Sequence, residues 1–185
     1  MDYISKGAQI SPCGKYRYAL WREWRGTHKH ENWYWTGSKD GAGRDYGWPK
    51  SCIFVMLNPS TADAEIDDPT IRRCVGFAKK WQYEKLVVLN LFAYRATDPK
   101  QLLALDHNDD PVGDRNQTAF NHFANASDAG MIVLAWGAHG KHLGQDEAVR
   151  GWIDGKPQYG LGLTKELCPR HPLYLKSDAV PLLLP

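Results

Sequence analysis

The stretch that decides the fold is an apolar run closed by a polar turn, Cys52-Ile53-Phe54-Val55-Met56-Leu57-Asn58-Pro59. A continuous apolar run of this length is typical of a strand that is buried on both faces, as parallel sheets require. Leu86–Leu91 and Met131–Ala135 have the same character, and Gln158–Leu163 is a weaker fourth strand. The sequence therefore predicts a mostly parallel sheet of four strands.

Helical patterns separate these strands. Pro69–Trp81 places apolar residues on one face, with Pro at its first turn and acidic residues just before it. Further helices are expected over Arg115–Ala126 and Ala138–Asp154. Alternating strands and helices favour an α/β fold, a three-layer α/β/α sandwich around the four-stranded sheet.

The segment before residue 51 has a different composition, rich in Trp, Gly and charged residues. Tyr16–Trp21 alternates as a half-buried strand does, and Glu31–Thr36 is its expected partner. We expect an N-terminal β-hairpin extension over residues 1–50, with Gly37–Pro49 as a loop, on an α/β/α core over residues 51–178. The chain, residues 1–185, is expected to form a single domain.

Bulk composition excludes several classes of protein. The net charge of +2 and pI near 8.3 do not by themselves indicate nucleic-acid binding. The four cysteines have no C-x-x-C spacing, which predicts reduced, mostly buried thiols and no zinc site. No apolar run approaches a membrane span and no secretory signal opens the chain, so a cytoplasmic location is expected. Nothing in the sequence indicates an obligate protein partner.

Three polar residues are predicted to meet at one edge of the sheet. Asn58 and Asn90 end two of the apolar strands, and His171 stands in a turn after the fourth. Ligands of open α/β sheets bind beyond the carboxyl ends of the strands. A carboxamide offers a donor and an acceptor together, which matches the edge of a nucleobase. Beside Arg170, a neutral imidazole that donates one hydrogen bond is favoured.

Structural roles compete with these functional ones. Asn58 before Pro59 also suits a turn, and Asp63, Asp67 and Asp68 suit turns and helix caps. Phe92 and Tyr94 follow Asn90 either as stacking aromatics or as core residues. His171 is equally compatible with an ordinary loop. The shared position at successive strand ends is the reason for preferring function.

Four motifs carry a resemblance to a known superfamily. Four short runs resemble, in the same order, motifs of the mismatch-specific branch of the uracil-DNA glycosylase superfamily. These runs are Leu57-Asn58-Pro59-Ser60, Val88-Leu89-Asn90, Val133-Leu134-Ala135-Trp136-Gly137 and His171-Pro172-Leu173-Tyr174-Leu175. More closely, three runs look like the family called domain-of-unknown-function 1643: Leu57–Asp63, Arg95–Pro99 and Arg170–Leu175. The second family implies no established activity.

The glycosylase resemblance implies roles for individual residues. Asn58 would orient the attacking water, Asn90 would read a flipped base, and His171 would donate to the base as it becomes an anion. Pro59 and Ser60 complete the base-binding motif, with Phe92 or Tyr94 stacking on the base. Leu175 would be the wedge that fills the vacated stack. The most active branch has an Asp where this chain has Asn58, so Asp68 is a candidate compensating base.

Basic residues near the expected mouth complete the prediction. Lys141, Arg170 and Lys176 would meet DNA phosphates. No metal ligand set and no organic cofactor are expected. The resemblance thus implies a DNA glycosylase-like hydrolase of a modified or mismatched base. A module that binds a nucleotide or modified base without cleaving it, and a hydrolase of free nucleosides or nucleotides, remain open as alternatives.

Overall fold

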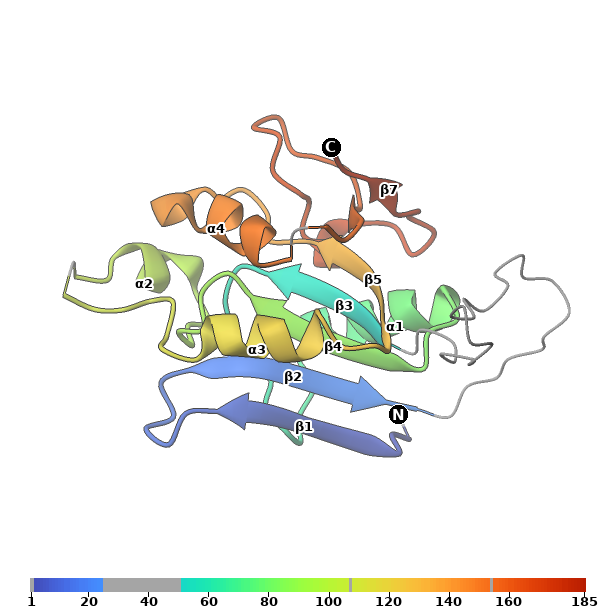
Figure 1. The fold of residues 1–185 in the computed structure, drawn as a ribbon, viewed down its shortest axis with the longest axis horizontal. Coiled ribbons are helices and arrows are strands. Elements are labelled where there is room, and N and C mark those ends of the chain that lie inside the picture. The colour runs from blue at the N-terminus through green and yellow to red at the C-terminus, as the bar shows by residue number, and fades with distance from the viewer. Residues whose placement is uncertain (1, 25–50, 107, 154) are drawn as a thin grey trace, which may run out of the picture.

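One mixed sheet contains all the strands of the computed structural model, which describes residues 2–24, 51–106, 108–153 and 155–185. The strand order is β1-β2-β4-β3-β5-β6-β7 (Figure 1). The strands are β1 (Ser5–Ile10), β2 (Arg17–Glu23), β3 (Ser51–Met56), β4 (Lys85–Asn90), β5 (Ala129–Leu134), β6 (Gln158–Gly160) and β7 (Leu182–Leu183). The mixed α/β class predicted from the sequence is confirmed.

The centre of the sheet is parallel. β3 pairs in parallel with β4 on one side and β5 on the other, and β5 pairs in parallel with β6. Every residue of β3 is buried, because helices and neighbouring strands surround it on all sides. The prediction of a four-stranded sheet is wrong in its count, since three antiparallel strands extend these four at the edges.

The N-terminal hairpin is part of the sheet. β2 pairs with β1 along one edge and with β4 along the other, both antiparallel. The expected partner of this strand, Glu31–Thr36, is therefore wrong; that segment and the expected loop Gly37–Pro49 lie outside the described residues. β1 escaped prediction because its partly exposed residues Ser5–Ile10 show no apolar alternation.

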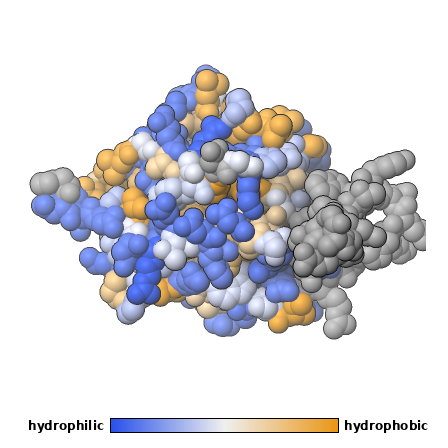
Figure 2. All heavy atoms as spheres, viewed as in Figure 1, coloured by the Kyte–Doolittle hydropathy of each residue, from blue (hydrophilic) through white to orange (hydrophobic). Residues whose placement is uncertain are grey.

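The C-terminal tail also enters the sheet. β7 pairs antiparallel with the short strand β6, and the amide of Leu184 donates to the carbonyl of Gln158 at 2.8 Å. Val180, Leu182 and Leu183 stay exposed. Figure 2 shows hydrophobic atoms at the place that β7 occupies in Figure 1. The tail thus forms the last edge strand, where only docking was expected.

Helices cover both faces of the sheet. The first helix has nearly its predicted bounds, whereas the helix expected over Ala138–Asp154 is shorter and follows a 3₁₀ turn. α2 was not predicted. The helices are α1 (Pro69–Lys80), α2 (Pro99–Leu103), α3 (Asn116–Phe123) and α4 (Gln145–Trp152), with 3₁₀ turns η1 (His142–Gly144) and η2 (Pro172–Tyr174).

Alternation along the strands divides the core into two clusters. Leu86 and Val88 of β4 pack with α1, whereas Val87 and Leu89 pack with residues of α3 and α4. In Figure 1, α3 lies in front of the sheet and α1 behind it. These two faces are called the α1 face and the α3 face below. No helix in the described ranges is long and apolar enough to cross a membrane.

Candidate functional site

The site predicted from the sequence lies at the carboxyl edge of the parallel strands. Beyond β3 and β4 the two chains continue side by side, because the amide of Leu91 donates to Met56 (2.8 Å) and that of Phe92 to Leu57 (3.0 Å). Beyond β5, the amide of Gly137 donates to Pro169 at 2.8 Å. These bonds bring the segments that carry Asn58, Asn90 and His171 to one edge of the sheet.

Asn90 is the most unusual residue of this edge. It is fully buried, yet neither its amide nitrogen nor its amide oxygen has a hydrogen-bond partner among the described residues. Alternation with Val88 and pairing with Met56 direct its side chain to the α1 face. An unsatisfied buried polar group costs about 1–3 kcal/mol of folding stability. Either this carboxamide hydrogen-bonds to a ligand, or it only destabilises the fold.

Asn58 is half-buried and anchored by its nitrogen. Its Nδ2 donates to the carbonyl of Ala96 at 2.8 Å and to that of Pro59 at 3.1 Å. These bonds hold the loop after β3 against the segment after β4. Because Nδ2 is occupied, Oδ1 is the atom that Asn58 has left for a ligand or a water.

His171 caps the turn η2, which packs against α1. Its Nδ1 accepts from the amide of Leu173 at 3.3 Å, which places the proton of the neutral ring on Nε2. Burial lowers the pKa of His171, and the charge of Asp68 acts in the opposite direction. Gly137, with a φ of 78°, lies so close that a Cβ there would be 3.8 Å from that of His171. The ring is therefore a neutral donor at pH 7.

Asp68 caps the helix that faces this edge. Its Oδ1 accepts from the amide of Ile71 at 2.8 Å, at the N-terminus of α1. No described residue donates to its Oδ2. Asp63 accepts from the amides of Glu65 and Ile66, and these bonds lower the pKa of Asp63. Of these carboxylates, Asp68 has the atom that remains available near His171.

Two buried arginines escaped prediction. In β2, Gln9 pairs with Ala19 and Ile10 with Arg17, so Tyr18 is an extra residue that forms a β-bulge. Bulges re-aim side chains, and here Arg17 donates from Nη1 to the carbonyl of Ala62 at 2.7 Å, on the α1 face. Burial lowers its pKa to about 10, and Asp68 opposes that effect. The sequence feature that could have identified Arg17 is the presence of an arginine inside the alternating, strand-like run Tyr16–Trp21.

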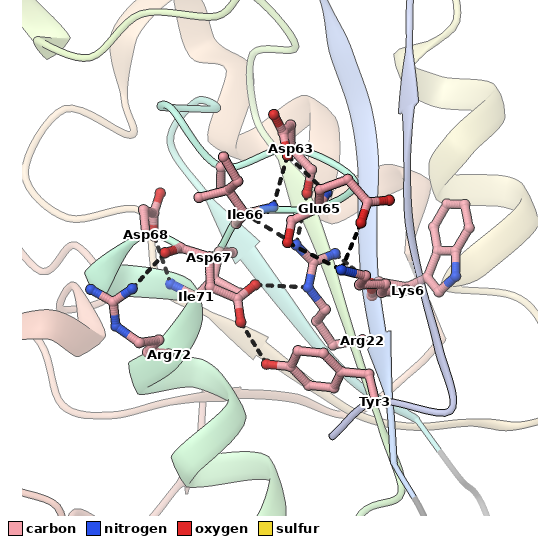
Figure 3. Close-up of polar contacts among 12 residues, drawn as sticks. Tyr3, Lys6, Arg22, Asp63, Glu65, Ile66, Asp67, Asp68, Ile71 and Arg72 are labelled. Carbon is pink, nitrogen blue, oxygen red and sulfur yellow. Dashed lines mark hydrogen bonds and ion pairs between the residues drawn. The ribbon is translucent and has the colours of Figure 1, made fainter. Parts of the chain in front are cut away.

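Arg22 holds the loop before α1 in place (Figure 3). Its Nε donates to Oδ1 of Asp67 at 2.7 Å, and Tyr3 donates to Oδ2 of the same carboxylate at 2.6 Å. Nη2 donates to the carbonyl of Asp63 at 2.7 Å. Burial, together with the hydrogen bond to Asp67, raises the pKa of Tyr3. This network ties the loop over 63–68, which carries Asp68, to β1 and β2.

The two aromatic candidates, Phe92 and Tyr94, both pack on the α3 face, and the two loop candidates, Pro59 and Ser60, follow β3. Phe92 is fully buried on the α3 face and contacts the ring of His142, so it does not meet Asn90. Tyr94 is half-buried against Tyr16. Pro59 is buried, whereas Ser60 lines a cavity of about 280 Å³ with Tyr94.

The candidates for DNA contact lie on the surface around η2 and η1. Arg170, Lys176 and Lys141 are exposed. Leu175 packs partly buried against the cluster on the α1 face, and Arg73 donates to its carbonyl. Tyr174, which the sequence reasoning did not single out, is 80% exposed beside His171, with ring centroids 5.7 Å apart. Tyr174 is thus the most exposed side chain of this turn, ahead of Leu173.

A family model described as "Protein of unknown function (DUF1643)" matches residues 17–173. The chain belongs to this family. The DUF1643 match begins with β2 and includes Arg17, Arg22, Asn58, Asn90 and His171. Leu175 and Lys176 lie after the end of the match. No curated protein and no solved structure matches the chain. The resemblance to the uracil-DNA glycosylase superfamily is therefore supported by none of these comparisons.

Two cavities of this DUF1643 protein are open to solvent. The larger, about 870 Å³, lies between β1 and α3, and the smaller is the one lined by Ser60 and Tyr94. Neither is lined by Asn90 or His171. The four cysteines are free, and all but Cys13 are buried, as predicted. Within the described ranges, no three His, Cys, Asp or Glu residues group as metal ligands; His28 and His30 lie outside those ranges.

Proposed function

We propose that this DUF1643 protein recognises a nucleobase at the carboxyl edge of its parallel strands. The observation that carries the proposal is Asn90, fully buried with both amide atoms unpartnered. A base edge offers the complementary donor and acceptor. Neighbouring strands lie about 5 Å apart, so about 10 Å separates the ends of β4 and β5. That span suits a planar heterocycle between Asn90 and His171.

We further propose a glycosylase-like reaction on a modified or mismatched base in DNA. The C1′–N bond breaks and its electron pair stays with the base, which His171 would stabilise through its Nε2 hydrogen. A water held by Oδ1 of Asn58 adds its hydroxyl to C1′, and Asp68 takes the released proton. Tyr174 or Leu175 would occupy the position that the flipped base leaves. Helices on both faces of the parallel strands are compatible with a three-layer, uracil-DNA glycosylase-like fold.

A binding module without turnover is the second candidate. Two observations favour it: an amide stands at position 58 where a carboxylate would activate water, and its nitrogen is bound to Ala96. Asn90 is also closed from solvent, so a base reaches it only if the chain around it opens. Recognition would then require a conformational change, which limits turnover.

Base release separates the two candidates. Duplexes carrying uracil, hydroxymethyluracil or a mismatch are incubated with the protein and then treated with alkali to reveal abasic sites. Release that disappears in Asn58→Ala and His171→Ala supports the hydrolase. Binding without release, lost in Asn90→Leu, supports the module. Cleavage of free nucleosides only would assign the remaining alternative, a nucleoside hydrolase.

A matched control keeps the assay interpretable. Phe92→Leu alters a buried residue two positions after Asn90 in sequence, but on the α3 face. We expect base binding to survive in this variant and to be lost in Asn90→Leu. Wild-type protein that neither binds nor releases any base in these assays would overturn the proposal.

A further inference from the structure

The cavity of about 280 Å³ lies where three loops meet at the carboxyl edge. These loops are the turn before β2, the segment after β3 and the segment after β4. Backbone bonds join them, because Arg95 donates its amide to Lys15 and Ala96 donates its amide to Pro59, each at 2.9 Å. We call this space the Arg95 cavity. Liquid water takes about 30 Å³ per molecule, so roughly nine waters fit, which is room for a phosphate with part of its sugar.

Apart from Gly14 and Ala96, the described residues that line the Arg95 cavity have cationic or hydroxylic side chains. Lys15 and Arg95 supply the charge, and none of the described residues that line the cavity has a carboxylate. Hydroxyl groups come from Ser60, Thr61, Tyr94 and Thr97. Hydroxyls and charged donors without an acid are the groups that contact phosphate oxygens in proteins.

Arg95 has donors that the protein does not use. Its Nη1 donates to the carbonyl of Gly14 at 3.2 Å, whereas its buried Nε has no hydrogen-bond partner in the part of the chain that the structure describes. Arg95 forms no ion pair with any residue in the described ranges. A partly buried guanidinium normally pairs with an anion because its desolvation is otherwise uncompensated. Asp63 interacts with Arg95 electrostatically without forming an ion pair, so the guanidinium keeps donors that can bind an anionic ligand.

The Arg95 cavity adjoins the amide site. Nδ2 of Asn58 donates to the carbonyls of both Pro59 and Ala96, so its side chain lies between the loops after β3 and β4. Arg17, on the neighbouring strand, interacts electrostatically with Arg95 and adds positive potential at neutral pH. Asn58 would therefore lie between β5 and an anionic group bound in this cavity.

We infer that the Arg95 cavity binds a phosphate group of the ligand whose base Asn90 recognises. This inference rests on the proposed function and names its substrate class as a phosphorylated nucleoside unit. That unit has two sources, a free nucleotide or one residue of a DNA strand. In either case Arg95 and Lys15 contact phosphate oxygens while the base reaches across Asn58.

Calorimetry with matched probes tests the inference. Thymidine, thymidine 5′-monophosphate, inorganic phosphate and a short thymidine oligonucleotide are titrated into wild type, Arg95→Gln and Lys15→Gln. Charge-assisted hydrogen bonds make the phosphorylated probes bind wild type about tenfold or more tightly than thymidine. We expect Arg95→Gln to abolish this preference and Lys15→Gln to reduce it.

Lys79→Gln is the control, because it removes the same charge from the last turn of α1, away from the cavity. Lys15 is exposed, so Lys15→Gln also tests the inference if Arg95→Gln does not fold. Tighter binding of the monophosphate assigns a free nucleotide, and tighter binding of the oligonucleotide assigns a strand; both support the inference.

Failure of this inference is distinguishable from failure of the proposed function. Equal affinity for thymidine and its monophosphate in wild type would overturn the phosphate site and leave base recognition intact. Binding of inorganic phosphate that Arg95→Gln abolishes, with no binding of thymidine, would support the phosphate site and count against the base site.

Discussion

Arg22 and Asp67 form an ion pair of 2.7 Å between Nε and Oδ1, with the arginine side chain fully buried. The pair joins strand β2 to the loop that precedes α1, and that loop carries the cap of the helix. The position of Asp68 at the candidate site therefore depends on the contact between Asp67 and Arg22, two residues that lie 45 positions apart in sequence. Stability and site geometry depend on the same arginine.

Removing this arginine should destabilise the protein strongly. We expect Arg22→Met to lower the free energy of unfolding by about 3–5 kcal/mol, because the largely buried Asp67 loses its ionic partner and keeps only the hydrogen bond from Tyr3. Lys6→Met breaks the exposed pair of Lys6 with Glu65 and should cost about 0–1 kcal/mol. Urea denaturation measures both. Equal losses would show that burial of the Arg22 pair adds nothing.

The two fully buried asparagines should respond in opposite directions. Asn90→Leu removes an unsatisfied amide, so we expect the free energy of unfolding to rise, by up to about 1–3 kcal/mol. Asn116 donates to the carbonyls of Asn90 and Leu91, so Asn116→Leu should lower it by about 1–3 kcal/mol. Thermal and urea unfolding compare them. A loss in Asn90→Leu as large as that in Asn116→Leu would remove the argument for an unoccupied binding group.

His171 should make stability depend on pH. Burial lowers the pKa of His171 in the folded protein. Its imidazole therefore binds a proton near pH 6.5 in the unfolded chain but only at a lower pH in the folded protein. Stability from this residue is complete above about pH 6.5 and falls as the pH decreases toward the folded pKa. The loss between pH 7.5 and 5.5 should be smaller in His171→Gln. An identical loss in the variant would exclude this contribution.

Asp68 should show separate capping and charge effects. Asp68→Ala removes the cap of α1 and should cost about 1 kcal/mol, whereas Asp68→Asn keeps a capping oxygen and should cost less. Asp68→Asn also removes the charge that raises the pKa of His171, so that pKa should fall further. Urea denaturation and NMR titration of the imidazole measure the two effects. An unchanged His171 pKa in Asp68→Asn would refute the electrostatic coupling.

The strands could be predicted only where burial on both faces requires a run of apolar residues in the sequence. β3, β4 and β5 are apolar at nearly every position because helices cover both of their faces. β1 and β7 are edge strands with exposed residues, so their sequences carry little of the strand pattern. β2 pairs with the strand just before it, β1, which was missed because Ser5–Ile10 lacks the apolar alternation of a half-buried strand; its other partner, β4, is distant in sequence.

The candidate site divides in the same way. Asn58, Asn90 and His171 were found because each ends or follows an apolar strand. Arg17 was missed because a bulge turns it toward the α1 face, and register is not visible in one strand alone. The Arg95 cavity was missed because its three loops come from segments distant in sequence, and the hydrogen bonds that join them are visible only in the tertiary structure.

By itself, the amino-acid sequence determined the α/β class, the central buried strands and the family, because these depend on local periodicity and on short contiguous motifs. Only the tertiary structure decided that Asn90 has no partner, that Arg22 is buried against Asp67, and that Arg95 and Lys15 share one cavity. Solvent exclusion and hydrogen bonding are properties of groups brought together in space, and no stretch of sequence records which groups those are.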